Sequence, residues 1–418
     1  MALRQVLAVA LCIAINVIDG FDILCASFTG PAIAHDWALD PTRLGLVFSA
    51  APLGMVAGAL LLAPLADRWG RRRMMPFYLL LVTVGMMGAA LAPDLRMLLI
   101  ARVSTGLGVA AAMAAANTVV AEQANNRWRD LCLSLQAGGF PLGATAGAMG
   151  YFLLAGLGWR FMYVLGAGVS AVFILGILAW MPESVAFLCR RRPTGALEQV
   201  NRILTDVELR DRAPRPHGAR MPAFGDLGFG TALICLAFFS LMFTFYFLTS
   251  WTPKLLTDYG LSAQMGVSGA VLMNLGGVAG DLVFAGLAGR WAAGRLGPLF
   301  MTACFVTAIG FAFLSGTLSA LLPMTFLLGF LLFGSMACLY ALVPSIFPAE
   351  IRTTGTGVAI GMGRIGATLG PYLGGVLIAS AWTRPAYLLA LSAPLLVCAA
   401  AALALQKRAS GVRNVFDR

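Results

Sequence analysis

The stretch Ala63-Pro-Leu-Ala-Asp-Arg-Trp-Gly-Arg-Arg-Arg73 places a cluster of arginines between two apolar runs, residues 43–65 and 74–92. Each run has about the 20 mainly apolar residues that a helix needs to cross a bilayer. Short loops rich in lysine and arginine are typical of the inner side of a membrane. The stretch therefore predicts two membrane-spanning helices that are joined at the inner face.

Apolar runs of the same kind fill the rest of the chain. Of its 418 residues, 60% are hydrophobic and only 11% are charged, whereas about a quarter of a soluble domain is charged. The net charge of +11 does not indicate nucleic-acid binding, because the basic residues lie mostly in short loops between the runs. We expect an all-α membrane protein with twelve transmembrane helices, near residues 6–34, 43–65, 74–92, 95–121, 130–155, 159–181, 228–251, 263–288, 297–317, 320–346, 354–380 and 384–405.

The placement of basic residues predicts the orientation. Of the 29 lysines and arginines, 22 fall on the side of the N-terminus and five on the other, with two inside helices. This asymmetry predicts that both termini are cytoplasmic. We expect the protein to lie in a plasma membrane of the bacterial inner-membrane type. The expected domains are two six-helix bundles with a cytoplasmic loop between them and a cytoplasmic tail: 1–181, 182–227, 228–405 and 406–418.

The central loop contains a helical pattern of its own. Its apolar residues recur at helical spacing and predict a short amphipathic helix on the inner membrane surface. These residues are Leu197, Val200, Ile203, Leu204 and Val207.

An internal repeat relates the two bundles. The string GATAG at Gly143–Gly147 returns as GATLG at Gly366–Gly370, an offset of 223. The same offset carries Arg129 onto Arg352 and Trp159 onto Trp382. Transporters built from such repeats place their site at the repeat interface and move one repeat against the other. For the glycines themselves we expect close helix packing rather than ligand binding.

The loop Ala63–Arg73 resembles the signature loop of the major facilitator superfamily, GxLADRxGRR. Gly70 permits a tight turn there. The segment Gly286–Arg290 echoes the loop in the second half, with Gly289 in place of the aspartate. The resemblance implies a conformational latch that consists of Asp67, Arg68, Gly70 and Arg71.

Two further segments resemble motifs of the same superfamily. Arg102–Gly108 resembles its RxxxGxG motif, and Pro182-Glu183-Ser184 resembles the PES motif of its sugar and organic-acid porters. At a finer level, Asp19-Gly-Phe-Asp22 is similar to the DGFD motif of the aromatic acid:proton symporters, as are the segments Thr249–Lys254, Ala349–Gly355 and Gly363–Gly366. That family takes up benzoate, hydroxybenzoates and related acids.

Three charged residues are candidates for proton coupling. Asp19 and Asp22 lie three residues apart and hence on one helical face. Two close carboxylates repel each other, so that a proton is readily held and released. A rise of about 1.5 Å per residue puts Arg102 at a depth similar to that of Asp22. The pair is either part of the coupling or merely a tie between helices, and both roles are compatible.

Substrate binding is expected from a different set of residues. Arg364 is one of few cations within the helices, and the family resemblance favours it as a partner of a carboxylate; alternatively it pairs with Asp281. The run 228–251 is rich in aromatic residues, of which Tyr246 and Trp251 also carry a polar group. We expect the substrate to contact Arg364, Trp251, Tyr246 and Arg102.

The expected function is proton-coupled uptake of an aromatic carboxylic acid by alternating access. The alternatives are proton-driven efflux of drugs or metabolites, and a membrane sensor that binds a ligand without carrying it. Neither a metal site nor a cofactor is predicted, since the eight cysteines and two histidines lack metal-ligand spacing, and no nucleophile and base are paired as in an enzyme. The expected partners are a small organic anion, protons and the bilayer, and we expect a monomer.

Overall fold

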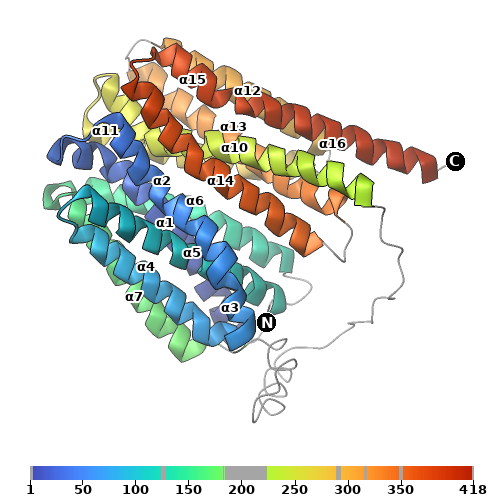
Figure 1. The fold of residues 1–418 in the computed structure, drawn as a ribbon, viewed down its shortest axis with the longest axis horizontal. Coiled ribbons are helices and arrows are strands. Elements are labelled where there is room, and N and C mark those ends of the chain that lie inside the picture. Colours follow the sequence, from blue (N-terminus) through green and yellow to red (C-terminus); the bar gives the residue numbers. More distant parts are fainter. Residues whose placement is uncertain are drawn as a thin grey trace. The chain divides into compact units, whose positions relative to one another are not determined.

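The computed structural model describes residues 3–123, 129–181, 183, 224–288, 293–314, 318–347 and 352–416. These residues are helical almost throughout and contain no strand (Figure 1). The elements are α1 (Leu3–Asp36), α2 (Pro41–Ala57), η1 (Gly58–Leu62), α3 (Ala63–Trp69), α4 (Arg71–Ala90), α5 (Leu95–Gln123), α6 (Arg129–Leu153), η2 (Ala155–Leu157), α7 (Trp159–Trp180), α10 (Phe224–Asp258), α11 (Ala263–Ala288), α12 (Ala293–Phe313), α13 (Leu318–Ile346), α14 (Arg352–Ala379), α15 (Arg384–Ser392) and α16 (Pro394–Phe416).

All twelve predicted apolar runs are helical in the parts that the structure describes, which confirms the predicted all-α fold. Two runs are divided in the structure: residues 43–65 form α2, the π turn η1 and the start of α3, and residues 384–405 form α15 and the start of α16, which begins at Pro394. Within the described ranges, ten segments are long and apolar enough to cross a membrane. The glycine-rich helices α6 and α14 are not among those ten. The predicted amphipathic helix in the central loop lies outside the described residues.

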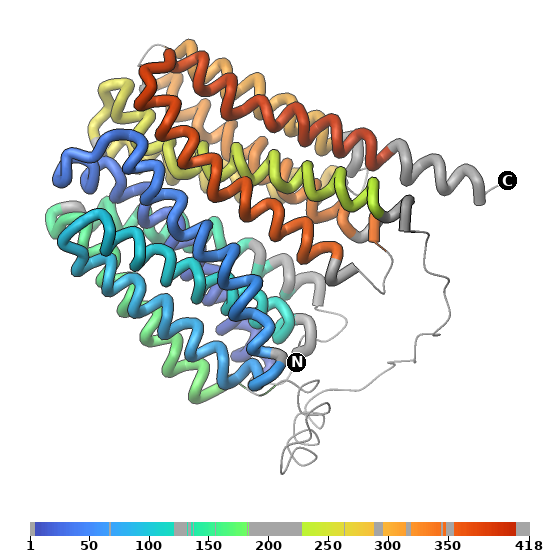
Figure 2. Tube along the Cα trace, viewed as in Figure 1, coloured from blue at the N-terminus to red at the C-terminus, as the bar shows by residue number. Residues whose placement is uncertain are grey.

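The chain forms two compact units. The first contains Met1–Ile23, Gly54–Gly147 and Arg160–Met221, and the second contains Leu24–Leu53, Ala148–Trp159 and Pro222–Arg418. Helix α1 therefore contributes its first part to one unit and its remainder to the other. Figure 2 traces the chain through both units in sequence order.

Glycines allow close helix contacts in the first unit. A methyl group at Gly54 or Gly58 would meet the backbone carbonyl of Val103 or Leu107 on α5. Gly20 and Gly143 similarly bring α1 and α6 together at the backbone level. Helices that approach this closely cannot accept a side chain at the contact.

The second unit repeats this packing. Gly276 and Gly280 on α11 lie against the carbonyls of Phe326 and Phe330 on α13, and each is 222 residues beyond Gly54 or Gly58. Helices α10 and α14 run side by side (Figure 1). A methyl group at Gly366 would meet the backbone carbonyl of Phe239. The predicted repeat is thus a repeat of backbone contacts, with glycine as the packing residue.

Candidate functional site

Asp22 and Arg102 form a buried ion pair inside the first unit. Nη1 of Arg102 donates to the Asp22 carboxylate, and Nη2 donates to the Asp22 backbone carbonyl at 3.1 Å. The side chain of Asp22 is 0% exposed and that of Arg102 is 1% exposed. The predicted contact between α1 and α5 is therefore present. A charge buried at this depth is costly unless it is paired, and here each charge compensates the other.

The surroundings of this pair are closed to solvent. Asp19 lies one turn from Asp22 on α1 and is also buried. The ring of Tyr163 on α7 lies 5.9 Å from the Arg102 guanidinium carbon, within the range of a cation–π contact. Tyr163 was not identified from the sequence, because only the tertiary structure brings α7 to Arg102.

In the second unit, Arg364 on α14 contacts Tyr246 on α10. Nη1 of Arg364 donates to the Tyr246 hydroxyl at 2.7 Å. Arg364 is half-buried. Within the described residues no ion pair joins it to Asp281, so the alternative in which these two residues pair is wrong. Two of the predicted substrate residues thus lie together.

Trp251, the third predicted substrate residue of this unit, is fully enclosed. Its Nε1 donates to the backbone carbonyl of Pro371 at 3.0 Å, and its ring meets the edge of Phe48 at 5.3 Å. The polar group of Trp251 is therefore used inside the protein in this state. Directly before it on α10, the backbone carbonyls of Thr249 and Ser250 accept hydrogen bonds from the Ser27 hydroxyl at 2.9 and 2.8 Å.

The predicted latch lies at the turn between α3 and α4. Gly70 has φ 95°, a conformation that favours glycine, and Arg71 begins α4. Asp67 lies on α3 and its side chain is outside the described part, whereas the Arg68 side chain is exposed. The structure therefore supplies the turn that the motif requires.

Glu183, which follows the end of α7, connects this turn to that helix. Its Oε1 accepts hydrogen bonds from the backbone N–H groups of Arg71 and Arg72, at 2.9 and 3.2 Å. Carboxylates stabilise helix N-termini in this way. The guanidinium of Arg72 also donates to the backbone carbonyl of Leu178 on α7 at 3.2 Å. The two sequence motifs are thus in direct contact, which their separation in sequence does not indicate.

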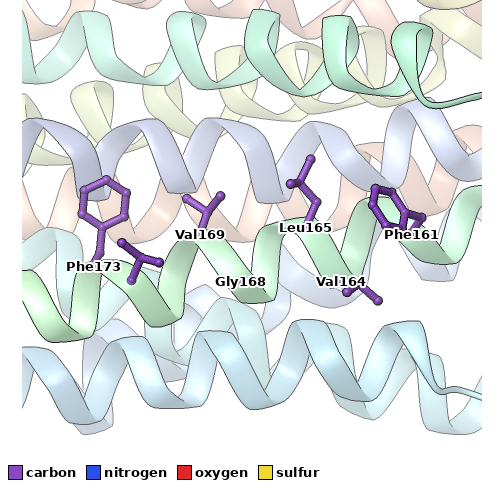
Figure 3. A pocket seen from close by; sticks show the side chains of 7 residues that line it. Phe161, Val164, Leu165, Gly168, Val169 and Phe173 are labelled. Carbon is purple, nitrogen blue, oxygen red and sulfur yellow. The ribbon is translucent and has the colours of Figure 1, made fainter.

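Other surfaces in the described ranges offer less chemistry. No group of three or more metal-ligating side chains is found there. A hollow along α7 is lined by apolar side chains from one helix only, including Phe161, Val164 and Phe173 (Figure 3). Such a surface suits contact with lipid tails and has no group that would bind an anion.

These features define an all-helical protein with ten described segments suited to crossing a membrane and a buried ion pair between two of them. The profile of the Major Facilitator Superfamily matches residues 12–363. The chain belongs to this superfamily, whose members are transporters and not enzymes.

Curated relatives match over nearly the whole chain. The 3-(3-hydroxy-phenyl)propionate transporter of Escherichia coli (strain K12) is 30% identical, over 99% of this chain and 97% of that protein. The 4-hydroxybenzoate transporter PcaK of Acinetobacter baylyi is 32% identical, over 96% and 90% of the two chains. The gallate transporter of Pseudomonas putida is 28% identical, over 96% and 92%.

A solved structure has the same fold. The inward open conformation of the xylose transporter XylE from E. coli superposes with a TM-score of 0.73 at 17% identity, covering 96% of this chain and 95% of that one. At this identity the likeness bears on the fold alone.

Proposed function

We propose that this protein imports an aromatic carboxylic acid together with protons, by alternating access. The observation that carries the proposal is the Asp22–Arg102 ion pair, buried within helices that cross the membrane. The relatives are named as transporters of 3-(3-hydroxy-phenyl)propionate, 4-hydroxybenzoate and gallate, and these names support the proposed substrate class. We further propose an inner-membrane monomer with cytoplasmic termini and two six-helix bundles, residues 1–181 and 228–405, as its moving parts.

The proton acts at the carboxylates of α1. When Asp22 binds a proton it loses its charge, and Arg102 is left as a cation in a medium of low dielectric. Such a cation strongly favours a new anionic partner. A substrate carboxylate supplies one, so that proton binding and substrate binding assist each other. Asp19, one turn away and also buried, is the second group that holds a proton in this mechanism.

The substrate is held in part by α10 and α14. Arg364 supplies the charge for a carboxylate, and the Tyr246 hydroxyl that it contacts supplies a neutral donor. Next to Tyr246, the rings of Phe245 and Phe333 pack edge to face at 4.9 Å. Aromatic surfaces beside a charged group suit an aromatic acid, which has one end of each kind. Trp251 becomes available when its bond to Pro371 opens.

In this proposal the latch regulates whether the substrate site is open to the inner or to the outer side of the membrane. The turn at Gly70 and the Glu183 cap keep α3 and α4 in a fixed geometry at the inner face. Arg68 and Arg71 are charged residues at this turn, and the family resemblance adds Asp67 on α3. We propose that they form and break ionic contacts during the transport cycle.

The test is uptake into membrane vesicles. Vesicles with an imposed inward proton gradient are given radiolabelled 4-hydroxybenzoate, and accumulation above equilibrium is expected. Asp22→Asn is expected to abolish accumulation while exchange of internal for external label persists. Accumulation that survives in this variant contradicts proton coupling through Asp22. Net flux outward in oriented vesicles indicates efflux instead, and absence of exchange in the wild type indicates a sensor.

A further inference from the structure

Asp281 in the second unit is a charged residue that the proposed mechanism does not use. It lies on α11, inside the segment Gln264–Leu287 that is suited to crossing a membrane, and it is the only ionisable residue of that helix. Its side chain is half-buried. A carboxylate at such a place is costly unless a partner compensates its charge or a proton removes it.

The helix that packs most closely on α11 offers no charged partner. Among the described residues, the carboxylate of Asp281 forms neither an ion pair nor a hydrogen bond. Helix α13 contains no acidic or basic residue, and its titratable side chains are those of Cys338 and Tyr340. No cation on α13 therefore keeps Asp281 ionised.

The other neighbouring helices, α10 and α12, do not change this result within the described part. On α10 the side chains of Lys254 and Asp258 pair with each other where that helix leads into α11, whereas Asp281 is near the opposite end of α11. Tyr246 on α10 is bonded to Arg364. The remaining titratable residues of the two helices are Cys235 and Cys304, together with Asp226 and Arg295, whose side chains lie outside the described part.

Asp281 lies on the side of α11 that meets other helices. Gly277, one turn before it, faces α13, since a methyl group there would lie 2.6 Å from the ring of Phe333. Phe284, three residues after Asp281, is only 3% exposed, whereas the adjacent Leu282 is 68% exposed. Residues three and four apart share one face of a helix. The carboxyl group is therefore on the protein side of α11 and not on the side of Leu282.

A proton from water has a short way to this carboxyl group. Asp281 is six residues from Leu287, where the apolar segment ends, which corresponds to about 9 Å along the helix. The half-buried side chain is also not sealed by its neighbours. A lone carboxyl group in such surroundings takes up a proton when they become less polar and releases it when water returns.

We propose that Asp281 is a further proton-binding site of the carrier and that its proton is carried in addition to the one on Asp22. One proton joins a carboxylate oxygen and later leaves it, and no other bond changes. The inference rests on the proposed function and specifies how many protons accompany the acid. The proton on Asp22 remains the one that frees Arg102 for the acid, because only those two side chains are paired.

Infrared spectroscopy of the purified protein tests the site without transport. A protonated carboxyl group absorbs at a frequency different from that of a carboxylate. In the wild type, one carboxyl band is expected to decrease as the pH rises, and Asp281→Asn is expected to lack it. The matched control is Asp258→Asn, which removes an ion-paired carboxylate of the same unit and should keep the band.

Two infrared results overturn the inference. A band that is missing from Asp281→Asn but constant with pH in the wild type shows a carboxyl group that is permanently neutral. Identical spectra of Asp281→Asn and the wild type at every pH show that Asp281 stays ionised. If Asp281→Asn does not fold, Asp281→Ser is measured in the same way.

The vesicle assay then counts the protons. At zero membrane potential, each proton carried raises the limiting accumulation of the acid about tenfold per pH unit of gradient. Accumulation in Asp281→Asn should therefore persist and increase less steeply with the gradient, by one proton, while Asp258→Asn matches the wild type. An unchanged dependence, or complete loss of accumulation in a folded variant, overturns the additional proton and leaves the proposed function standing. If the wild type moves no aromatic acid, the proposed function fails, and the infrared result still decides whether Asp281 binds a proton.

Discussion

The contact of α1 with α5 and the contact of α10 with α14 use one arginine each, in different ways. In the first unit Arg102 is fully buried and meets a carboxylate, Asp22. In the second unit Arg364 is half-buried and donates to a neutral hydroxyl, that of Tyr246. The glycine-to-carbonyl packing is nevertheless the same in both units. The repeat has therefore kept its backbone contacts while its polar side chains have taken on different chemistry.

This difference suggests a division of roles. A fully enclosed ion pair changes its charge balance only when a proton arrives, which suits coupling. An arginine that is partly accessible and has a neutral neighbour keeps its charge for an incoming anion. In our proposal the first unit handles the proton and offers Arg102 to the acid once Asp22 is protonated, whereas Arg364 in the second unit is available to the acid throughout.

The largest effect is expected from removing one partner of the buried Asp22–Arg102 ion pair. Arg102→Met leaves Asp22 without its cation and should destabilise the protein by about 3–5 kcal/mol, with complete loss of uptake. Thermal unfolding in detergent and uptake in vesicles measure the two effects. The double variant Asp22→Leu with Arg102→Met should recover much of the stability and none of the uptake. Recovered uptake in the double variant would show that the pair is only a tie between helices.

A smaller structural effect is expected at Arg364. Because its side chain is half-buried and its neighbour is neutral, Arg364→Met should lower Tm much less than Arg102→Met. It should raise KM for the acid at least about tenfold, since a charge-assisted hydrogen bond contributes roughly 1.5–3 kcal/mol. Arg364→Lys is the matched control and should recover part of the affinity. An unchanged KM in both variants would remove Arg364 from the substrate site.

The packing itself should respond equally in the two units. Gly58→Ala and Gly280→Ala each place a methyl group against a backbone carbonyl, and overpacking of this kind costs about 1–3 kcal/mol. Gly286→Ala is the control, because nothing lies within 4 Å of its added methyl group. Equal decreases in Tm support the structural repeat, and a decrease in one unit alone would limit it to that unit.

The smallest effect is expected from the helix cap. Glu183→Gln weakens the bonds to the N–H groups of Arg71 and Arg72 and should cost about 0.5–1 kcal/mol of stability. If the latch depends on this geometry, the rate of uptake falls while KM stays unchanged. A change in KM without a change in rate would contradict this role for Glu183.

The sequence alone determined the features that depend on local composition. Runs of apolar residues and arginine-rich loops predict twelve helices, and all twelve are present in the described parts of the chain, because a bilayer requires about 20 apolar residues in each helix regardless of its neighbours. The same argument identified Asp19, Asp22, Arg102 and Arg364, since a charge within such a run is conspicuous.

The tertiary structure decided which of these residues meet. The contact of Asp22 with Arg102 was expected from depth, but depth equally allowed Asp281 to pair with Arg364, and Arg364 contacts Tyr246 instead. Depth follows from the number of residues along a helix, whereas pairing depends on how each helix is rotated about its axis. That rotation is set by the glycine-to-carbonyl contacts between helices far apart in sequence, so only the folded structure reveals it.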